Sequence, residues 1–351
     1  MTVSAGYDVG TMFCQMAIQG KDGEVITSNI RNAFVEIPES DDTEEVLTRN
    51  GWQWVRDGKS IFVVGEDSIQ VAKLFPGSIS IRRPLQDGVL NKNEEKKNIV
   101  LASIIESQLG RAKDNTSVVA ICVSSPCIDN SADGVFHTAR LKSMFSRLGW
   151  NVKVIEEALA VVLSERPCVI DNNGSEIPYS GIGISFGAGR ANCMLAFKGM
   201  PIIGMSVSNC GDWVDRMVSE QTGVPIAQVM DFKEKKLDFN NLDTDNDVIF
   251  ALDAYYDSML RHIFSLFAKK FKEVKADFNH PLDVVMAGGT SMPSGFETKV
   301  EKIVRSLELP FSINRITRSK DPRHSVVNGL LTQAEIVRRK LEKGQITRES
   351  I

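Results

Sequence analysis

Three glycine-containing turns in this sequence have the residue types of backbone sites for anions. The first is Asp8-Val9-Gly10-Thr11, close to the start of the chain. Its glycine lets the backbone approach an anion, and its hydroxyl and amides can hold phosphate oxygens. A carboxylate beside phosphates acts through Mg²⁺ and the waters of the ion. Taken alone, these four residues are a weak signal, and an ordinary β-turn is the preferred interpretation.

The other two turns lie in the second half of the chain. Gly187-Ala188-Gly189 follows an apolar run, as does Gly288-Gly289-Thr290. With one turn in each half, the first two turns can clamp a polyphosphate from both sides. The flat glycine backbone of the third can lie against a base or a ribose, although by itself this turn also fits a plain connection between a strand and a helix.

The segments around these turns alternate between strand-like and helix-like patterns. Val3 to Ile18 is a strand-like run that breaks at Gly10, which predicts a β-hairpin. Val118–Val123 is a continuous apolar run, typical of a buried parallel strand. In residues 245–275 apolar residues recur at three- and four-residue steps, which predicts one long helix with most of its aromatic residues in the core. The alternation favours an α/β fold.

The second half repeats the opening pattern of strand, glycine turn and strand. This repetition predicts a duplicated nucleotide-binding half, although glycine hairpins are common enough to match by coincidence. Residues 33–82 differ in character, with an acidic segment and two tryptophans, and are expected to form an inserted subdomain. The charged end, Arg338 to Ile351, is expected to fray.

Composition sets outer limits on the function. The chain has 351 residues and a mass of 38.8 kDa, which exceeds the usual size of one hydrophobic core and favours two domains. Its 41 basic and 45 acidic residues give a net charge of −4, so neither disorder nor a basic polyanion-binding protein fits. With no apolar run of roughly 18 residues, we expect a cytoplasmic protein.

The cysteines are scattered through apolar segments without the spacing of a metal site, and there are four histidines to assist them. Reduced, buried thiols are therefore expected. The six are Cys14, Cys122, Cys127, Cys168, Cys193 and Cys210.

The order and approximate spacing of the motifs resemble those of the actin-like ATPase superfamily over nearly the whole chain. The ordered set is Asp8–Thr11, Ile155–Ala160, Gly187–Gly189, Gly211–Asp215 and Gly288–Met292. Further segments are similar to the filament-forming bacterial and archaeal members MreB, MamK and ParM, or to actin itself. These segments are Arg83–Val89, Asp231–Lys235, Asp321-Pro322 and Val327–Gly329.

The resemblance implies an actin-like, ribonuclease H-like duplicated fold with two domains around a nucleotide cleft. Domain I would be residues 1–158, with the insertion at about 33–82. Domain II would be residues 159–330, with a second insertion at about 216–276. A C-terminal helix at about 331–348 would return to domain I.

The resemblance also implies ATP or ADP with Mg²⁺ as cofactors. Asp8 would act on the metal through water, and Glu157 would orient the attacking water as the catalytic residue. From the sequence alone, Glu157 fits equally well as a cap of the helix that follows. The implied nucleotide-binding residues are Asp8, Gly10, Thr11, Ser185, Gly187, Gly189, Gly211, Lys233, Glu234, Gly288, Gly289, Thr290 and Met292.

The chain departs from the family pattern at Ser185. The family usually has an acid at this position, and a neutral hydroxyl cannot replace a carboxylate charge near Mg²⁺. Arg190 also stands where small or β-branched residues are usual. Slow ATP hydrolysis is therefore expected, and Ser185→Asp is expected to raise turnover.

The implied function is an ATP-binding cytoskeletal protein that forms nucleotide-dependent filaments, such as those that segregate plasmid DNA or position an organelle. Its partners would be further copies of itself and an adaptor or cargo protein. An alternative is a nucleotide-gated scaffold or adaptor with little or no ATPase activity. A small-molecule kinase is disfavoured because the acid before the second-half turn is missing.

Direct contacts with nucleic acid or membrane are not expected. The loop at 110–117, which corresponds to a membrane loop of MreB proteins, is polar here. Met144, Phe145, Leu148 and Trp150 can form a small amphipathic face, but core packing is the preferred interpretation.

Overall fold

The computed structural model describes residues 4–20, 22–39, 42–74, 79–129, 134–165, 169–170, 174–177, 179–273 and 281–351. The chain divides into two compact units, which are described separately. The first unit comprises Met1–Cys122, Ala132–Ile155 and Leu330–Ile351, and the second comprises Val123–Ser131 and Glu156–Gly329.

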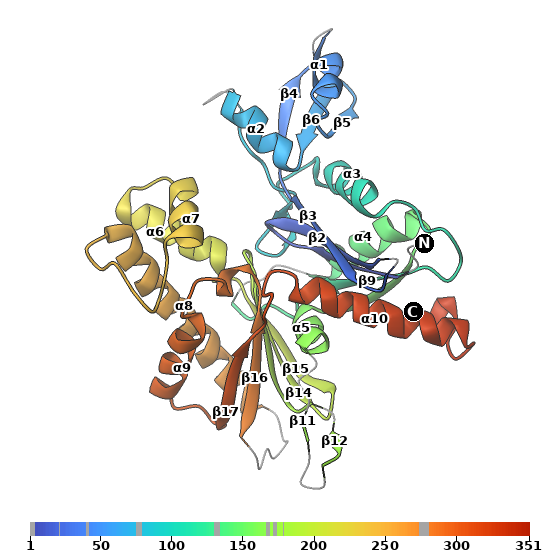
Figure 1. Ribbon diagram of the computed structural model, residues 1–351. Helices are drawn as coiled ribbons and strands as arrows, with labels where there is room; N and C mark the ends of the chain where they lie inside the picture. The colour runs from blue at the N-terminus through green and yellow to red at the C-terminus, as the bar shows by residue number, and fades with distance from the viewer. Residues whose placement is uncertain are drawn as a thin grey trace. The chain divides into compact units, whose positions relative to one another are not determined.

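The first unit is built on a five-stranded sheet in the order β10-β9-β1-β2-β3 (Figure 1). Its strands are β1 (Ser4–Val9), β2 (Phe13–Gln19), β3 (Val25–Arg31), β9 (Val118–Val123) and β10 (Asn151–Glu156). β1 pairs antiparallel with β2 and parallel with β9. Apolar side chains of the sheet pack with those of α3 (Lys97–Leu109) and α4 (Gly134–Arg147) into one core. This core fixes the strand ends that carry Asp8 and Gly10.

Residues 34–74 of the first unit form a smaller layer of their own. A three-stranded antiparallel sheet in the order β4-β6-β5 packs with two helices around a separate apolar cluster. The elements are β4 (Phe34–Pro38), α1 (Thr43–Arg49), β5 (Trp54–Asp57), β6 (Ser60–Val64) and α2 (Glu66–Leu74). A short hairpin of β7 (Leu85–Gln86) and β8 (Val89–Leu90) follows, and its turn takes positive φ angles at Asp87 and Gly88.

The second unit has a five-stranded sheet in the order β15-β14-β13-β16-β17. Its strands are β13 (Gly181–Phe186), β14 (Ala191–Phe197), β15 (Met200–Val207), β16 (Leu282–Ala287) and β17 (Ile313–Arg318). The helices are α5 (Glu157–Glu165), α6 (Gly211–Thr222), α7 (Ile226–Lys235), α8 (Asp247–Phe271) and α9 (Phe296–Ser306), with a short 3₁₀ helix η1 (Gly289–Ser291). The two-residue strands β11 (Val169–Ile170) and β12 (Glu176–Ile177) pair with each other. α10 (Ser325–Glu342) begins in this unit and ends in the first.

The two sheets have the same topology. Each sheet contains an antiparallel meander of three strands, whose first strand, β1 or β13, also pairs in parallel with a later strand, β9 or β16. One further strand, β10 or β17, lies at the edge beyond that pair. The hairpin turns match as well: the amide of Gly10 donates to the carbonyl of Phe13 at 3.0 Å, and that of Gly187 donates to Arg190 at 2.9 Å. The predicted repetition is therefore a duplicated sheet and no coincidence of hairpins.

The long helix predicted in the second half is α8, which provides much of the core of its unit. Asn246 caps its start by accepting hydrogen bonds from the amides of Val248 and Ile249. The ring of Tyr256 meets that of Phe296 edge-on at 6.2 Å, and its hydroxyl donates to the carbonyl of Thr290 at 3.1 Å. Most aromatic residues of α8 are thus core, although Phe250 is 60% exposed, and Tyr256 supports the third glycine turn.

Burial settles two of the side-chain expectations. Met144, Phe145, Leu148 and Trp150 are all buried in the core of the first unit, as the core interpretation predicted. The described cysteines are free thiols, four of them buried and Cys127 half-buried. Cys168 lies outside the described residues.

The expectation that the charged C-terminus frays from Arg338 is wrong. α10 continues to Glu342, and Arg338 donates to the hydroxyl of Ser4 at 3.1 Å. Arg348, beyond the helix, donates to Asn151 at 2.8 Å. Charged side chains tie this segment to the first unit, which its composition alone does not reveal.

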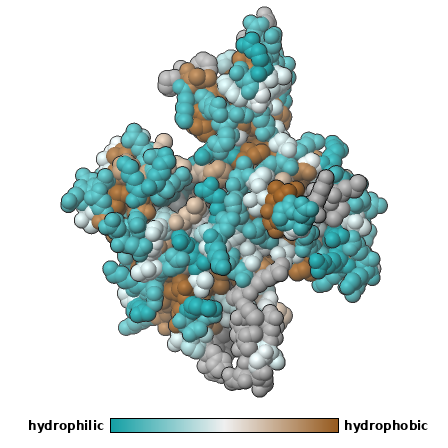
Figure 2. Space-filling view, in the orientation of Figure 1, coloured by the Kyte–Doolittle hydropathy of each residue, from teal (hydrophilic) through white to brown (hydrophobic). Residues whose placement is uncertain are grey.

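Within the described residues, no helix is both long and apolar enough to cross a membrane. The face shown in Figure 2 is mostly hydrophilic, with hydrophobic atoms gathered in small separate groups. Scattered groups of this kind are normal on protein surfaces.

Candidate functional site

In the first unit, the turn after β1 accepts hydrogen bonds through its carbonyls and has two amides without a described acceptor. The side chain of Asn32 donates to the carbonyl of Gly10 at 2.8 Å, and its backbone amide donates to the carbonyl of Met12 at 2.9 Å. The described part of the chain provides no acceptor for the amides of Thr11 and Met12. Consecutive free amides in a turn form an anion-binding concavity.

Asp8 lies beside this turn, two residues before Gly10. The thiol of Cys122 donates to its Oδ1 at 3.2 Å, and no ion pair to it occurs among the residues described. Burial raises the pKa of the Asp8 carboxyl to about 6, and the Cys122 hydrogen bond opposes this rise. An incoming cation would stabilise the ionised form.

These features fit the magnesium ion that the actin-like family implies. Mg²⁺ keeps several waters and is held through one or two carboxylates and substrate phosphates, so a cluster of protein ligands is not required. The side-chain oxygen of Asn32 is a buried acceptor without a hydrogen-bond partner among the described residues. It adds a second polar group beside the turn.

In the second unit, three chain segments converge on the carbonyl of Gly187. It accepts hydrogen bonds from Thr290 Oγ1 at 2.7 Å, from Cys210 Sγ at 3.0 Å and from the amide of Gly211 at 3.3 Å. The next carbonyl, of Ala188, accepts from the amide of Asp212 at 2.8 Å. The second turn, the start of α6 and η1 are therefore one assembled unit.

The same turn has the free amides seen in the first unit. No described residue accepts a hydrogen bond from the amide of Ala188 or of Gly189. A Cβ on Gly187 would lie 2.8 Å from the carbonyl oxygen of Arg190, and one on Gly10 would lie 2.7 Å from that of Phe13. Both turns therefore require glycine for the same steric reason.

Glycine is also required where the other two segments meet the turn. A Cβ on Gly211 would lie 2.4 Å from Thr290 Oγ1. Gly288 has a φ of 99°, and its Cβ would lie 2.3 Å from the carbonyl oxygen of Phe186. In contrast, a Cβ on Gly289 would meet no atom within 4 Å, so this glycine borders open space.

Glu157, the predicted catalytic residue, begins α5 and is held by two neutral donors. Its Oε1 accepts from the hydroxyl of Ser185 at 2.6 Å, and its Oε2 accepts from the side-chain amide of Asn192 at 2.7 Å. Ser185 and Asn192 are 1% and 0% exposed. Ser185 therefore acts on Glu157, and its buried hydroxyl is not presented to a phosphate.

Sequence reasoning missed Asn192, although a signal for it was present. Asn192 stands directly opposite Ser185 in the β13–β14 register, just as Gln15 stands opposite Asp8 in β1–β2. In both halves the facing residue follows seven positions later, so the repeated hairpin marks the position.

Lys233 is engaged with a protein partner. Its ammonium pairs with Asp215 Oδ2 at 2.6 Å and donates to the carbonyl of Gly211 at 3.5 Å. The sequence motif included Asp215 without giving it a role. The pair joins α7 to α6, next to the segment that contacts the Gly187 turn.

The remaining predicted residues differ in accessibility. Glu234 is exposed on α7, and Met292 is 42% exposed after η1. Thr290 is buried, and its hydroxyl donates to the carbonyl of Gly187.

The closing motif at Asp321-Pro322 has a positioning role that the sequence did not suggest. The carbonyl of Pro322 accepts from the amide of Gly288 at 2.8 Å. Arg318, just before it, donates to the carbonyl of Ser291 at 2.7 Å and to that of Met292 at 3.0 Å. Both contacts hold the third glycine turn in place.

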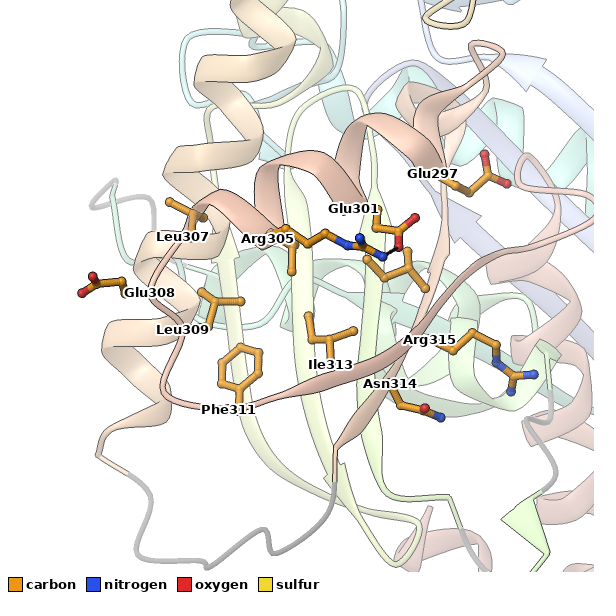
Figure 3. A pocket seen from close by; sticks show the side chains of 12 residues that line it. Glu297, Glu301, Arg305, Leu307, Glu308, Leu309, Phe311, Ile313, Asn314 and Arg315 are labelled. Atoms are coloured by element: carbon orange, nitrogen blue, oxygen red, sulfur yellow. Dashed lines mark hydrogen bonds and ion pairs between the residues drawn. The ribbon is translucent and has the colours of Figure 1, made fainter.

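A groove of about 690 Å³ lies elsewhere in the second unit, between α9 and β17 (Figure 3). Leu307, Leu309, Phe311 and Ile313 provide much of its apolar lining, with charged side chains at its rim. None of the predicted site residues lines it.

Comparison with known proteins identifies the family. A family model described as Volactin matches residues 3–334. The chain is 18% identical to a structure titled "MamK double helical filament", with a TM-score of 0.69 over 94% of this chain and 98% of that one. It is 14% identical to MreB 5 of Spiroplasma citri bound to AMPPNP, with a TM-score of 0.68 over 97% and 98%.

The ADP-bound form of MreB5 from the same organism gives a TM-score of 0.66 at 14% identity, again over 97% of this chain and 98% of that one. No curated protein sequence matches the chain. At these identities the structural likeness shows the fold, and it confirms the actin-like α/β fold that the motifs predicted. The chain belongs to the Volactin family.

Proposed function

We propose that this protein binds ATP with Mg²⁺ and assembles into filaments in a nucleotide-dependent manner. The observation that supports the proposal most strongly is the repeated turn. The amides of Thr11 and Met12 in one unit, and those of Ala188 and Gly189 in the other, are the free donors of two equivalent turns. Phosphate oxygens are the acceptors that such turns bind.

In this proposal, each remaining residue has a defined task. Asp8 binds the waters of Mg²⁺, which neutralises charge on the phosphates. Glu157 accepts a hydrogen bond from the attacking water. Gly289 and Glu234 adjoin the nucleoside, because one borders open space and the other is exposed. Lys233 pairs with Asp215 and so helps to hold α6 in position.

Thermal melting and calorimetry test nucleotide binding. A ligand that binds only the folded state stabilises it by about 2.7 kcal/mol at a hundredfold excess over its dissociation constant. The melting temperature should rise with ATP and Mg²⁺, and less with ATP and a chelator. The absence of both a shift and a calorimetric signal with millimolar ATP, ADP, GTP and GDP contradicts the proposal.

Filament formation is supported by the structural likeness to a double helical filament of MamK. The cellular task that we propose is organisation of the cell interior, either the segregation of plasmid DNA or the positioning of an organelle. Electron microscopy with ATP, with ADP and without nucleotide separates a polymer from a protein that stays monomeric.

A nucleotide-gated scaffold with little turnover is the second candidate. The contact that favours it is the 2.6 Å hydrogen bond from Ser185 to Glu157, because no second carboxylate stands at residue 185. This function predicts nucleotide binding by calorimetry without measurable release of phosphate.

A further inference from the structure

We infer that Ser185 and Asn192 are positioning residues for Glu157, and that a neutral donor at residue 185 is required because the carboxylate of this half lies on α5. The inference rests on the proposed ATP hydrolysis for its functional consequence. It reverses the expectation that Ser185→Asp raises turnover.

The geometry that supports the inference begins with strand register. Ser185 on β13 and Asn192 on β14 are direct partners across the hairpin, so their side chains lie on the same face of the sheet. One reaches Glu157 Oε1 at 2.6 Å and the other reaches Oε2 at 2.7 Å. Two donors on the two oxygens fix both the position and the plane of the carboxylate.

The helix that carries Glu157 is held close to the sheet. A Cβ on Gly183 would lie 2.7 Å from Val162 Cγ2 and 2.9 Å from the carbonyl oxygen of Ala158. α5 therefore packs directly on β13, which brings its first residue, Glu157, within hydrogen-bond distance of Ser185. Because Ser185 and Asn192 are almost fully buried, water cannot replace either donor at low cost.

Comparison of the two halves explains why residue 185 is neutral. In the first half, the acid is on the strand at Asp8, and its described donor is the thiol of Cys122. In the second half, the strand position carries the donor Ser185, and the acid is Glu157 on the helix. The carboxylate of the second half therefore stands on the helix beside residue 185, and an aspartate at 185 would place two like charges in contact.

A carboxylate fixed in this way can still serve the attacking water. Each carboxylate oxygen has two lone pairs, so the hydrogen bonds from Ser185 and Asn192 do not by themselves exhaust the acceptor capacity of Glu157. In hydrolysis, the water oxygen forms a bond to the γ-phosphorus while the bond to the β–γ bridging oxygen breaks. The proton of the water passes to Glu157 and then to the released phosphate. Ser185 and Asn192 touch neither water nor phosphate in this step.

The first test compares ATP turnover and nucleotide affinity in Ser185→Ala, Asn192→Ala and Ser185→Thr. Misplacement of a catalytic group by about 1 Å costs roughly a hundredfold in rate. Both alanine variants should therefore lose ten- to a hundredfold in kcat with KM and calorimetric affinity little changed. Ser185→Thr, which keeps the hydroxyl, should recover most of the rate.

Ser206→Ala is the matched control for loss of a buried serine hydroxyl. Ser206 is fully buried on β15 of the same sheet, and it donates to the carbonyl of Ser125. This variant should lose stability without losing turnover. Equal losses of kcat in Ser185→Ala and Ser206→Ala would show a merely structural role and overturn the inference.

The second test needs no nucleotide, so it separates failure of this inference from failure of the proposed function. Ser185→Asp should lower the melting temperature at pH 8, and the deficit should shrink towards pH 5 as one carboxylate of the pair is protonated. Adding Glu157→Gln should restore stability, because the Gln amide can donate to the new aspartate. A Ser185→Asp variant as stable as the parent, or one with faster turnover, overturns the inference. Absence of ATP binding by the parent removes the proposed function alone.

Discussion

Asp8 and Glu157 are half-buried carboxylates with different surroundings. A hydroxyl and a side-chain amide donate to Glu157, whereas the donor described for Asp8 is a thiol, which is a weak donor. The pKa of Asp8 is accordingly raised to about 6 by burial. A site that tolerates such a carboxylate is suited to a cation that arrives with the ligand.

The raised pKa of Asp8 predicts a pH-dependent cost to the ligand-free protein. Because the folded pKa lies above the ordinary value of 3.8, the protonated form stabilises the fold below about pH 4, and this contribution is lost as the pH rises through 6. At about 1.4 kcal/mol per unit, the loss is roughly 1–3 kcal/mol. Asp8→Asn should therefore gain free energy of unfolding relative to the parent between pH 4.5 and pH 8.

Urea unfolding without Mg²⁺ at the two pH values provides the measurement. Asp245→Asn, at an exposed position, serves as the control and should show no comparable gain. Asp8→Asn should also lose the Mg²⁺ dependence of nucleotide binding. A stability difference that stays constant across this pH range contradicts the assigned environment of Asp8.

At the residue level, the sequence indicated where polar groups lie better than what they contact. The glycines of the first two turns are required sterically, because a carbonyl oxygen of the same turn lies where a Cβ would be. Lys233 and Thr290 were assigned to the nucleoside, yet their partners are Asp215 and the carbonyl of Gly187. Such pairings depend on how distant elements pack, and no local pattern in one chain records that packing.

At the element scale, the joint between α6 and α7 depends on the buried pair of Lys233 and Asp215. Removing one member of a buried ion pair leaves an uncompensated charge and costs about 3–5 kcal/mol. Lys233→Met should therefore lower the free energy of unfolding by about this amount. Asp215→Asn combined with Lys233→Met should lower the free energy of unfolding less, because the uncompensated charge of Asp215 is removed as well.

Lys235→Met provides a control on the same helix. Lys235 pairs with Asp231 on the surface, and exposed pairs of this kind contribute little to stability. Urea unfolding measures stability, and calorimetry measures ATP affinity. If the double variant recovers stability but not affinity, Lys233 contacts the nucleotide, as the sequence had suggested, and its proposed supporting role is wrong.

The convergence of α6, η1 and the Gly187 turn leads to a prediction about two glycines. Gly211→Ala places a methyl group 2.4 Å from Thr290 Oγ1, so it should cost about 1–3 kcal/mol and weaken ATP binding. Gly289→Ala adds its methyl group to open space, so stability should hold while affinity falls. Gly134→Ala, also in open space but at the start of α4, should change neither.

Melting curves and calorimetry on these three variants provide the check. Equal stability of Gly211→Ala and Gly134→Ala would mean that the three segments are not rigidly joined. Unchanged affinity in Gly289→Ala would place the nucleoside elsewhere.

Elements were predictable where periodicity is strong. α8 lies within the predicted range 245–275, and the apolar run at 118–123 is β9. The helix expected at about 331–348 is α10, whose buried Leu330, Ala334 and Val337 recur at helical spacing. Fraying from Arg338 was mispredicted because the order of the charged end depends on long-range bonds from Arg338 and Arg348.

At the scale of the whole molecule, duplication is what made the fold predictable. Five strands in the same order, with hairpin turns of equal length, appear twice in the chain. A motif that occurs once is weak evidence for a fold, but its recurrence at the same position of a second sheet is strong evidence. The divergence between the halves, with an acid at residue 8 and a donor at 185, is therefore informative about function.

The same whole-molecule view leads to a prediction about assembly. Head-to-tail contacts use two different surfaces of each copy, so they need not close and can grow into filaments. Polymer should therefore appear only above a threshold concentration, and that threshold should be lower with ATP than with ADP.

Glu157→Gln should slow turnover while leaving binding intact, so its ATP filaments should persist longer than those of the parent. Sedimentation across a concentration series, followed by electron microscopy, provides the measurement. A chain that stays monomeric with every nucleotide far above micromolar concentration contradicts the filament proposal and favours the scaffold, whereas equal lifetimes for parent and Glu157→Gln filaments mean that assembly follows binding alone.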